Sequence, residues 1–223
     1  MVTSKFCPMK KNPFWQFLWI FLLINSCIVI RSRQVDDGTK SLTKEDSAKI
    51  FPFDIGSINQ KTEYITSSEI IFQRITANDL KQLILLKPYT WVLICASWCP
   101  ISERAIYRYS ELSKHIPEDS FQLVIISQDL NIKALQKEIF QSSYSHIPYL
   151  IDSKLYGTDE HVKQKKFITD FNKNLPLDFF KNGGVPTCLL FNQNAELLYL
   201  TGGTLITCDT IKKYTNLECN KKQ

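Results

Sequence analysis

The sequence contains no Cys-x-x-Cys motif, because no two of its cysteines lie three residues apart. Structural zinc sites usually combine such pairs, and the three histidines are dispersed, so we expect no metal site and no cofactor. An odd number of cysteines at irregular spacing also does not indicate a disulfide framework. The seven are Cys7, Cys27, Cys95, Cys99, Cys188, Cys208 and Cys219. Each must therefore be interpreted from its own position.

Clusters of one charge are also missing from the interior of the chain. The 27 basic and 22 acidic residues give a net charge of only +5, and the basic residues are scattered except near the ends. This pattern predicts no nucleic-acid partner. With 223 residues, 44% of them hydrophobic, the chain can form one well-packed domain with accessory segments, or two small domains at most.

The amino terminus has no acidic residue before Asp36, and three lysines precede an apolar run at residues 14–30. This order is typical of a secretory signal peptide, although an uncleaved membrane anchor remains an alternative. Within the run, Leu-Ile-Asn-Ser-Cys at residues 23–27 resembles a bacterial lipoprotein cleavage box, so we favour lipidation of Cys27. Either interpretation places the rest of the chain in the bacterial cell envelope, outside the cytoplasm and attached to the membrane.

Behind this segment, residues 31–68 are polar without a clear period and predict a linker. Residues 69–219 carry the elements of one domain, and residues 220–223 form a tail. We expect strands at 70–74, 91–96, 121–127 and 149–152, a closing hairpin around Asn192-Gln193-Asn194, and helices after Thr76 and Cys99, at 132–139, 161–171 and 205–217. Strands alternating with helices predict an α/β sandwich around a mixed sheet.

Two motifs carry a resemblance to a known fold. The first is the buried run WVLICA, which ends in Ser-Trp-Cys-Pro at residues 97–100. The second is Gly-Val-Pro-Thr at residues 184–187, followed by a strand, a polar turn, a strand and two glycines. Together they resemble the thioredoxin-like superfamily, and specifically its membrane-attached redoxin and thiol–disulfide oxidoreductase branch. Over residues 70–217 the resemblance implies a three-layer sandwich, with a helical insertion at roughly 129–182 before the cis-proline strand.

The resemblance implies that Pro186 is a cis-proline facing Cys99. A second isoleucine-proline pair at Pro148 competes for this role, but a long helical segment follows it instead of a hairpin. The resemblance also implies that Trp98, Pro100, Val185 and Thr187 contact a substrate chain: Trp98 as an apolar platform, and the backbone beside Pro186 by pairing with an extended strand.

Cys99 is the candidate nucleophile. An α-helix that begins beside it would stabilise a thiolate through its free N–H groups, and proline suits the first helical position. Ser102 stands where the family has a second cysteine, and we expect its hydroxyl to bond the Cys99 sulfur. Without a resolving thiol, mixed disulfides on Cys99 would last until an outside thiol breaks them. Leu93 replaces the buried acid of thioredoxins, so that proton relay is not expected.

The other cysteines have structural interpretations. Cys95 and Cys188 fall in buried strands, and a resolving role for Cys188 is a less favoured alternative. Cys208 and Cys219 can pair only if the final helix breaks between them, because eleven residues of continuous helix span about 16 Å.

Two classes of function follow from these residues. The favoured one is an envelope thiol–disulfide oxidoreductase-like protein that exchanges disulfides with protein thiols through Cys99 alone. The alternative is a non-catalytic binding module of the same fold, tethered to the membrane. A peroxidase using Arg104 fits less well, because the Trp-Cys-Pro-Ile-Ser setting lacks the expected threonine before the cysteine.

Overall fold

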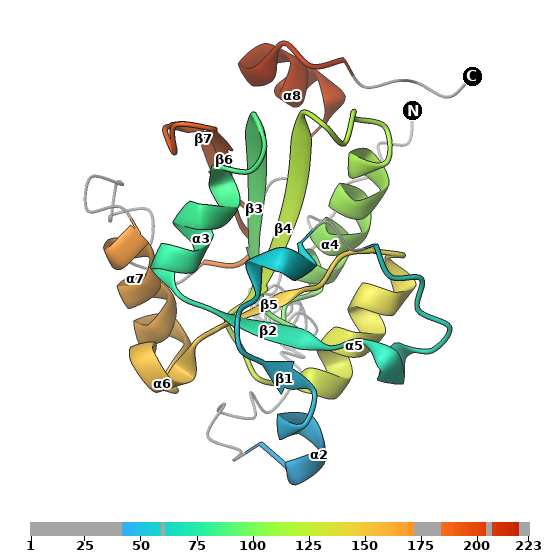
Figure 1. The fold of residues 1–223 in the computed structure, drawn as a ribbon, viewed down its shortest axis with the longest axis vertical. Coiled ribbons are helices and arrows are strands. Elements are labelled where there is room, and N and C mark those ends of the chain that lie inside the picture. Colours follow the sequence, from blue (N-terminus) through green and yellow to red (C-terminus); the bar gives the residue numbers. More distant parts are fainter. Residues whose placement is uncertain (1–41, 59–60, 172–183, 204–206, 219–223) are drawn as a thin grey trace, which may run out of the picture. The chain divides into compact units, whose positions relative to one another are not determined.

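The computed structural model describes residues 42–58, 61–171, 184–203 and 207–218. In these residues the strands form one sheet in the order β1-β2-β5-β4-β3-β6-β7 (Figure 1). The first five strands in this order run parallel to one another. β6 pairs antiparallel with β3, and β7 pairs antiparallel with β6. Their bounds are β1 Ile50–Phe51, β2 Phe72–Ile75, β3 Tyr89–Cys95, β4 Phe121–Ser127, β5 Tyr149–Ile151, β6 Thr187–Asn192 and β7 Leu197–Gly202.

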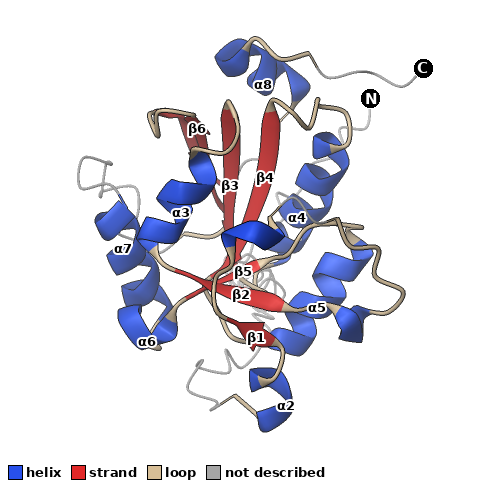
Figure 2. Ribbon diagram, in the orientation of Figure 1, coloured by secondary structure: helices blue, strands red, loops and turns tan. Residues whose placement is uncertain are grey.

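Helices cover both faces of the sheet, as Figures 1 and 2 show. One face packs against α3 (Ala77–Ile84), α6 (Ser153–Tyr156) and α7 (Glu160–Phe171). The other packs against α4 (Pro100–Ser113), α5 (Ile132–Gln141) and α8 (Cys208–Thr215), and α2 (Lys44–Ser47) precedes β1. This three-layer α/β sandwich with a mixed sheet confirms the predicted fold class.

The central strand β3 delivers the candidate nucleophile to one edge of the sheet. It pairs along its length with β4 on one side and with β6 on the other. From Trp91 to Cys95 it is completely buried, with alternate side chains entering the two helix-covered cores. A strand covered on both faces needs an uninterrupted apolar sequence, which explains the run that identified it.

The side chains of Thr76 and Asp79 cap the start of α3, the helix expected after Thr76. The Thr76 hydroxyl accepts from the Asp79 N–H at 3.3 Å, and the Asp79 carboxylate accepts from the Thr76 N–H at 2.8 Å. This reciprocal capping box satisfies two N–H groups that the helix would otherwise leave free.

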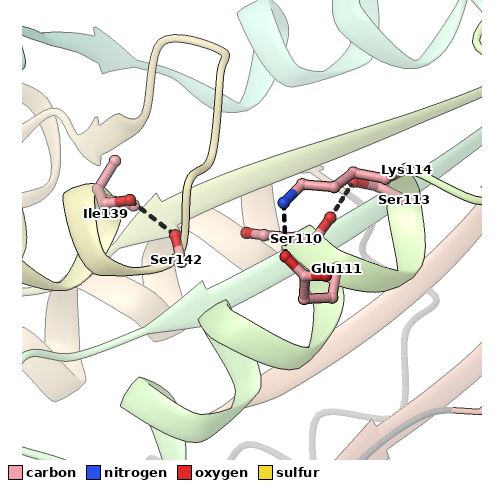
Figure 3. Close-up of polar contacts among 6 residues, drawn as sticks. All are labelled: Ser110, Glu111, Ser113, Lys114, Ile139 and Ser142. Carbon is pink, nitrogen blue, oxygen red and sulfur yellow. Dashed lines mark hydrogen bonds and ion pairs between the residues drawn. The ribbon is translucent and has the colours of Figure 1, made fainter. Parts of the chain in front are cut away.

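Serine hydroxyls close the last turns of α4 and α5 (Figure 3). Ser113 donates to the Ser110 carbonyl at 2.8 Å, and Ser142 donates to the Ile139 carbonyl at 2.7 Å. Carbonyls at helix ends lack intrahelical partners, so these bonds help to end both helices at the edge of the sheet away from Cys99.

Part of the predicted linker belongs to the domain instead. In the described part of residues 31–68, β1 pairs in parallel with β2, and Ile50 is buried. The Thr62 N–H also donates to the Ser145 carbonyl at 2.8 Å. A two-residue strand is too short to show an alternating pattern, so it could not be predicted from the residue pattern. Residues 31–41 lie outside the described residues.

The insertion before β6 is also more than helical. It contains α5 and α7 near the predicted helices and the short α6, which was not predicted. The strand expected at 149–152 is present as β5, which enters the sheet between β2 and β4, so the insertion is not purely helical.

The two ends of the chain bear on the remaining predictions. Residues 1–30, with Cys27, and residues 220–223 lie outside the described residues. No helix in the described ranges has the length and apolar character needed to cross a membrane. The final helix is shorter than predicted and is followed by Asn216 in a left-handed conformation with φ of 58°. Cys208 is disulfide-bonded, whereas Cys219 lies outside the described residues.

Candidate functional site

Cys99 occupies the N-cap position of α4, directly after the loop that leaves β3. Its N–H donates to the Ala96 carbonyl at 3.1 Å, and its own carbonyl accepts from the Glu103 N–H at 3.2 Å. Pro100 fills the first helical position, which suits a residue without an N–H, and its side chain is exposed. The thiol is free but only 7% of the residue is exposed. The helix start therefore presents a single, largely shielded sulfur.

The second motif lies against this sulfur. The Val185–Pro186 peptide bond is cis, and it is the only cis bond among the described residues, so Pro148 does not have this geometry. Cys99 Sγ donates to the Val185 carbonyl oxygen at 3.3 Å. The two motifs that carried the resemblance, distant in sequence, thus meet at one point.

Ser102 does not bond to Cys99. The side chain is completely buried, and its oxygen accepts from the Ala96 N–H at 3.3 Å. The expected bond to the Cys99 sulfur is absent because that sulfur turns across the site towards Val185. Ser102 therefore supports the loop after β3 instead of the thiol.

The predicted substrate-binding residues differ in how much of each side chain is exposed and free of hydrogen bonds within the fold. Trp98 is half-buried, and its Nε1 donates to Glu160 Oε2 at 2.7 Å. Val185 is half-buried, while Thr187 is buried and donates to the Gly184 carbonyl at 2.7 Å. The Thr187 side chain is thus used within the fold, and its contribution to a bound chain would be limited to the backbone.

The buried thiols Cys95 and Cys188 are both free, so neither forms a disulfide with Cys99. Cys188 Sγ lies 2.9 Å from the Tyr109 hydroxyl, and burial raises the pKa of Cys188 to about 12. Burial also raises the pKa of Cys95 well above its ordinary value, and its Sγ donates to the Ile126 carbonyl. Thiols held protonated in a core are poor nucleophiles, which argues against a resolving role for Cys188.

Two acidic residues beside the site were not singled out from the sequence. Asp129 follows β4, and its Oδ2 accepts from the Ser97 N–H at 2.5 Å. Glu160 begins α7 and holds the Trp98 indole. One signal was available for Asp129: parallel strands end at the same edge of a sheet, so polar residues directly after β4 lie near residues that follow β3. No such signal existed for Glu160, whose place depends on how α7 packs.

Within the described ranges, no group of three or more His, Cys, Asp or Glu side chains is arranged to hold a metal ion. Leu93 is completely buried in the core on the α4 side of the sheet. The acidic groups near Cys99 thus approach from the α7 side and from the loop after β4.

Comparison with known proteins gave matches only among solved structures. No protein-family model matches the chain, and no curated protein matches it. StoA from Bacillus subtilis is 20% identical with a TM-score of 0.39, and the match covers 58% of this chain and 84% of that one. A thioredoxin-related protein from Neisseria meningitidis serogroup B is 13% identical with a TM-score of 0.42, and the match covers 58% of this chain and 84% of that one. A thiol:disulfide interchange protein of the thioredoxin family from Chlorobium tepidum is 14% identical with a TM-score of 0.43, and the match covers 59% of this chain and 80% of that one. Such distant similarity carries no argument about activity, which must come from the site itself.

Proposed function

We propose that this chain is a thiol–disulfide exchange protein of the thioredoxin-like kind that acts through Cys99 alone. The observation that carries the proposal is the position of the free Cys99 thiol at the start of α4, against the carbonyl that precedes Pro186. A buried serine, and not a second thiol, occupies the next turn at residue 102.

The reaction follows from these groups. The Cys99 thiolate attacks one sulfur of a disulfide in a partner protein, a new S–S bond forms, and the partner's other sulfur leaves as a thiolate. The free N–H groups at the start of α4 favour the attacking thiolate. Ser102 cannot break the mixed disulfide, so an external thiol must attack it and regenerate Cys99. The site thereby suits isomerisation or capture of partners better than net reduction.

Partner proteins with accessible disulfides or thiols are the proposed substrates. An extended chain can reach the site through the exposed Pro100 and the half-buried Trp98 and Val185. We also propose that residues 1–30 attach the domain to the membrane on the envelope side, through an anchor or through lipid on Cys27.

One observation favours the alternative of a non-catalytic binding module. The Cys99 sulfur donates to the Val185 carbonyl at 3.3 Å, so it already has a partner within the fold. Exchange chemistry therefore requires that an incoming partner displaces this contact.

Trapping of mixed disulfides tests the proposal. The full-length chain is expressed in its own cell or a related one, thiols are blocked by rapid alkylation, and adducts are separated without reductant. We expect discrete adducts in the wild type without any engineered second mutation, because no resolving thiol is present. Cys99→Ala should abolish them.

Cys188→Ala serves as the matched control, because this thiol is free but completely buried. It should leave the adduct pattern unchanged. If the wild type forms no adducts, or if the adducts survive Cys99→Ala, the single-thiol mechanism is wrong and the binding module becomes the better account.

A further inference from the structure

The two residues before Cys99 are each held by a carboxylate. Trp98 Nε1 donates to Glu160 Oε2 at 2.7 Å, and the Ser97 N–H donates to Asp129 Oδ2 at 2.5 Å. Asp129 also accepts from the Asn131 N–H at 3.1 Å, which fixes its own orientation. The loop that carries the thiol is therefore fastened from α7 and from the end of β4.

A buried cation belongs to the same group of residues. Lys163 is one turn after Glu160 on α7, and it is completely buried. Its amine has no hydrogen-bond partner within the described part of the chain. Burial lowers the pKa of Lys163, while the charges of Glu160, Asp129 and Asp159 raise it. The amine thus acts on the carboxylates through its charge.

The same two influences, burial and neighbouring charge, shift the pKa values of Glu160 and Asp129 in the direction opposite to that of Lys163. Burial raises the pKa of Glu160 and that of Asp129, and the charge of Lys163 lowers both. Burial of an ion without a counter-charge is costly, so removal of the amine would favour protonated carboxylates.

The other groups facing this cluster are few. Asp159 and His161 contribute charges from the start of α7, and Cys95 at the end of β3 lies within the field of Asp129. Gln128 and Gln164 are buried and uncharged neighbours in sequence. Lys163 is therefore the buried cation of this cluster in the part of the chain that the structure describes.

We propose that Glu160 and Lys163 are positioning residues for Cys99: Glu160 holds the indole of Trp98, the residue directly before the thiol, and the buried Lys163 one turn along α7 supplies the positive charge that supports this hold. The proposal rests on the proposed function, because the group being positioned is the Cys99 thiol. It assigns to α7 a role that the motifs around Cys99 and Pro186 do not contain.

A pH dependence follows from this arrangement. An ionised carboxylate accepts a stronger hydrogen bond than a protonated one, so the Trp98 indole is held tightly above the pKa of Glu160 and loosely below it. Because burial raises that pKa, the release falls at a higher pH than for an exposed glutamate. Without Lys163 the carboxylate takes up its proton at a higher pH still, and release begins there.

The fluorescence of Trp98 as a function of pH provides the test. The signal of this residue is the difference between each full-length protein and its Trp98→Phe counterpart. We expect a transition in the wild type, an upward shift of its midpoint by about one pH unit or more in Lys163→Met, and no transition in Glu160→Gln. Alkylation of Cys99, followed in parallel, should change in rate in Lys163→Met relative to the wild type at any pH between the two midpoints, because Trp98 is the residue directly before Cys99.

Lys165→Met is the matched control, because this lysine is exposed on the same helix. It should keep the wild-type midpoint. An unchanged midpoint in a Lys163→Met protein with wild-type circular dichroism overturns the proposal. So does a transition that persists in Glu160→Gln, and this second variant decides the question if Lys163→Met does not fold. Glutamine at the half-buried residue 160 still offers an acceptor oxygen but does not titrate.

These results are separable from those of adduct trapping. If Cys99 captures no partners while its alkylation still follows Lys163, the proposed function fails and the positioning role stands. If partners are captured but neither Trp98 nor the alkylation rate responds to Lys163, only the positioning role fails.

Discussion

The two faces of the sheet meet the candidate site in different ways. On the side of α4, α5 and α8, the core beneath Cys99 is apolar, and Cys95 and Cys188 are enclosed in it as neutral thiols. On the side of α7, the core ends near Trp98 in a buried lysine and two carboxylates. One face thus isolates the spare thiols, while the other connects the thiol loop to charged groups. Reactivity at Cys99 should accordingly be tuned from the α7 side.

Truncation of a large aromatic residue on the apolar face should have the largest effect on stability. Trp91 is completely buried, and its ring centroid lies 5.2 Å from that of Tyr109 and 6.3 Å from that of Phe121. Trp91→Ala should lower the free energy of unfolding by about 3–5 kcal/mol, as measured by chemical denaturation.

The same truncation on the other face sharpens the comparison. Phe167 of α7 is also completely buried, with its ring centroid 5.6 Å from that of Tyr156. Phe167→Ala should cost a similar amount but also alter the pH response of Trp98, because α7 carries Glu160. The opposite result, in which the pH response of Trp98 changes in folded Trp91→Ala but not in Phe167→Ala, would contradict the conclusion that only the α7 face is linked to the thiol loop.

The next effect concerns the enclosed thiols. In the folded protein Cys188 and Cys95 should react with an alkylating reagent at least about 100-fold more slowly than Cys99, because they require an opening of the structure. Mass spectrometry of partly alkylated protein, digested after quenching, measures the three rates. Comparable rates for Cys188 and Cys99 would show that the apolar face does not isolate its thiols.

The smallest effect comes from the hydroxyl that contacts Cys188. Tyr109→Phe removes the contact at 2.9 Å and should lower the free energy of unfolding by about 1 kcal/mol. The control is Tyr107→Phe at an exposed position of the same helix, where no measurable change is expected. Thermal or chemical unfolding of both variants makes the comparison, and equal values for the two would refute the contribution of this contact.

Some of this architecture was predictable from local sequence, and some was not. The strand at residues 121–127 has the bounds that its apolar run indicated, and α3 begins directly after Thr76 as expected. These features depend on residues that are neighbours in the chain. By contrast, β1 has only two residues and exists because β2 offers it an edge.

The site shows the same limit. The meeting of Cys99 with Val185 followed from the resemblance, whereas the place of Ser102 did not follow from its spacing. Whether its hydroxyl bonds the sulfur or the Ala96 N–H depends on where the sulfur turns, and this is decided by a segment far along the chain. The contact between Trp98 and Glu160 spans 62 residues and depends on the packing of an inserted helix.

The placement of β3 has a mechanical consequence. Under the proposed function, a partner joined covalently to Cys99 would pull on the domain, and the load would enter the sheet at the end of β3. Strands on both sides share that load through continuous ladders of hydrogen bonds, whereas an edge strand would peel away from a single neighbour. A mixed disulfide on Cys99, if formed as proposed, would therefore load an interior strand with two neighbours instead of an edge strand.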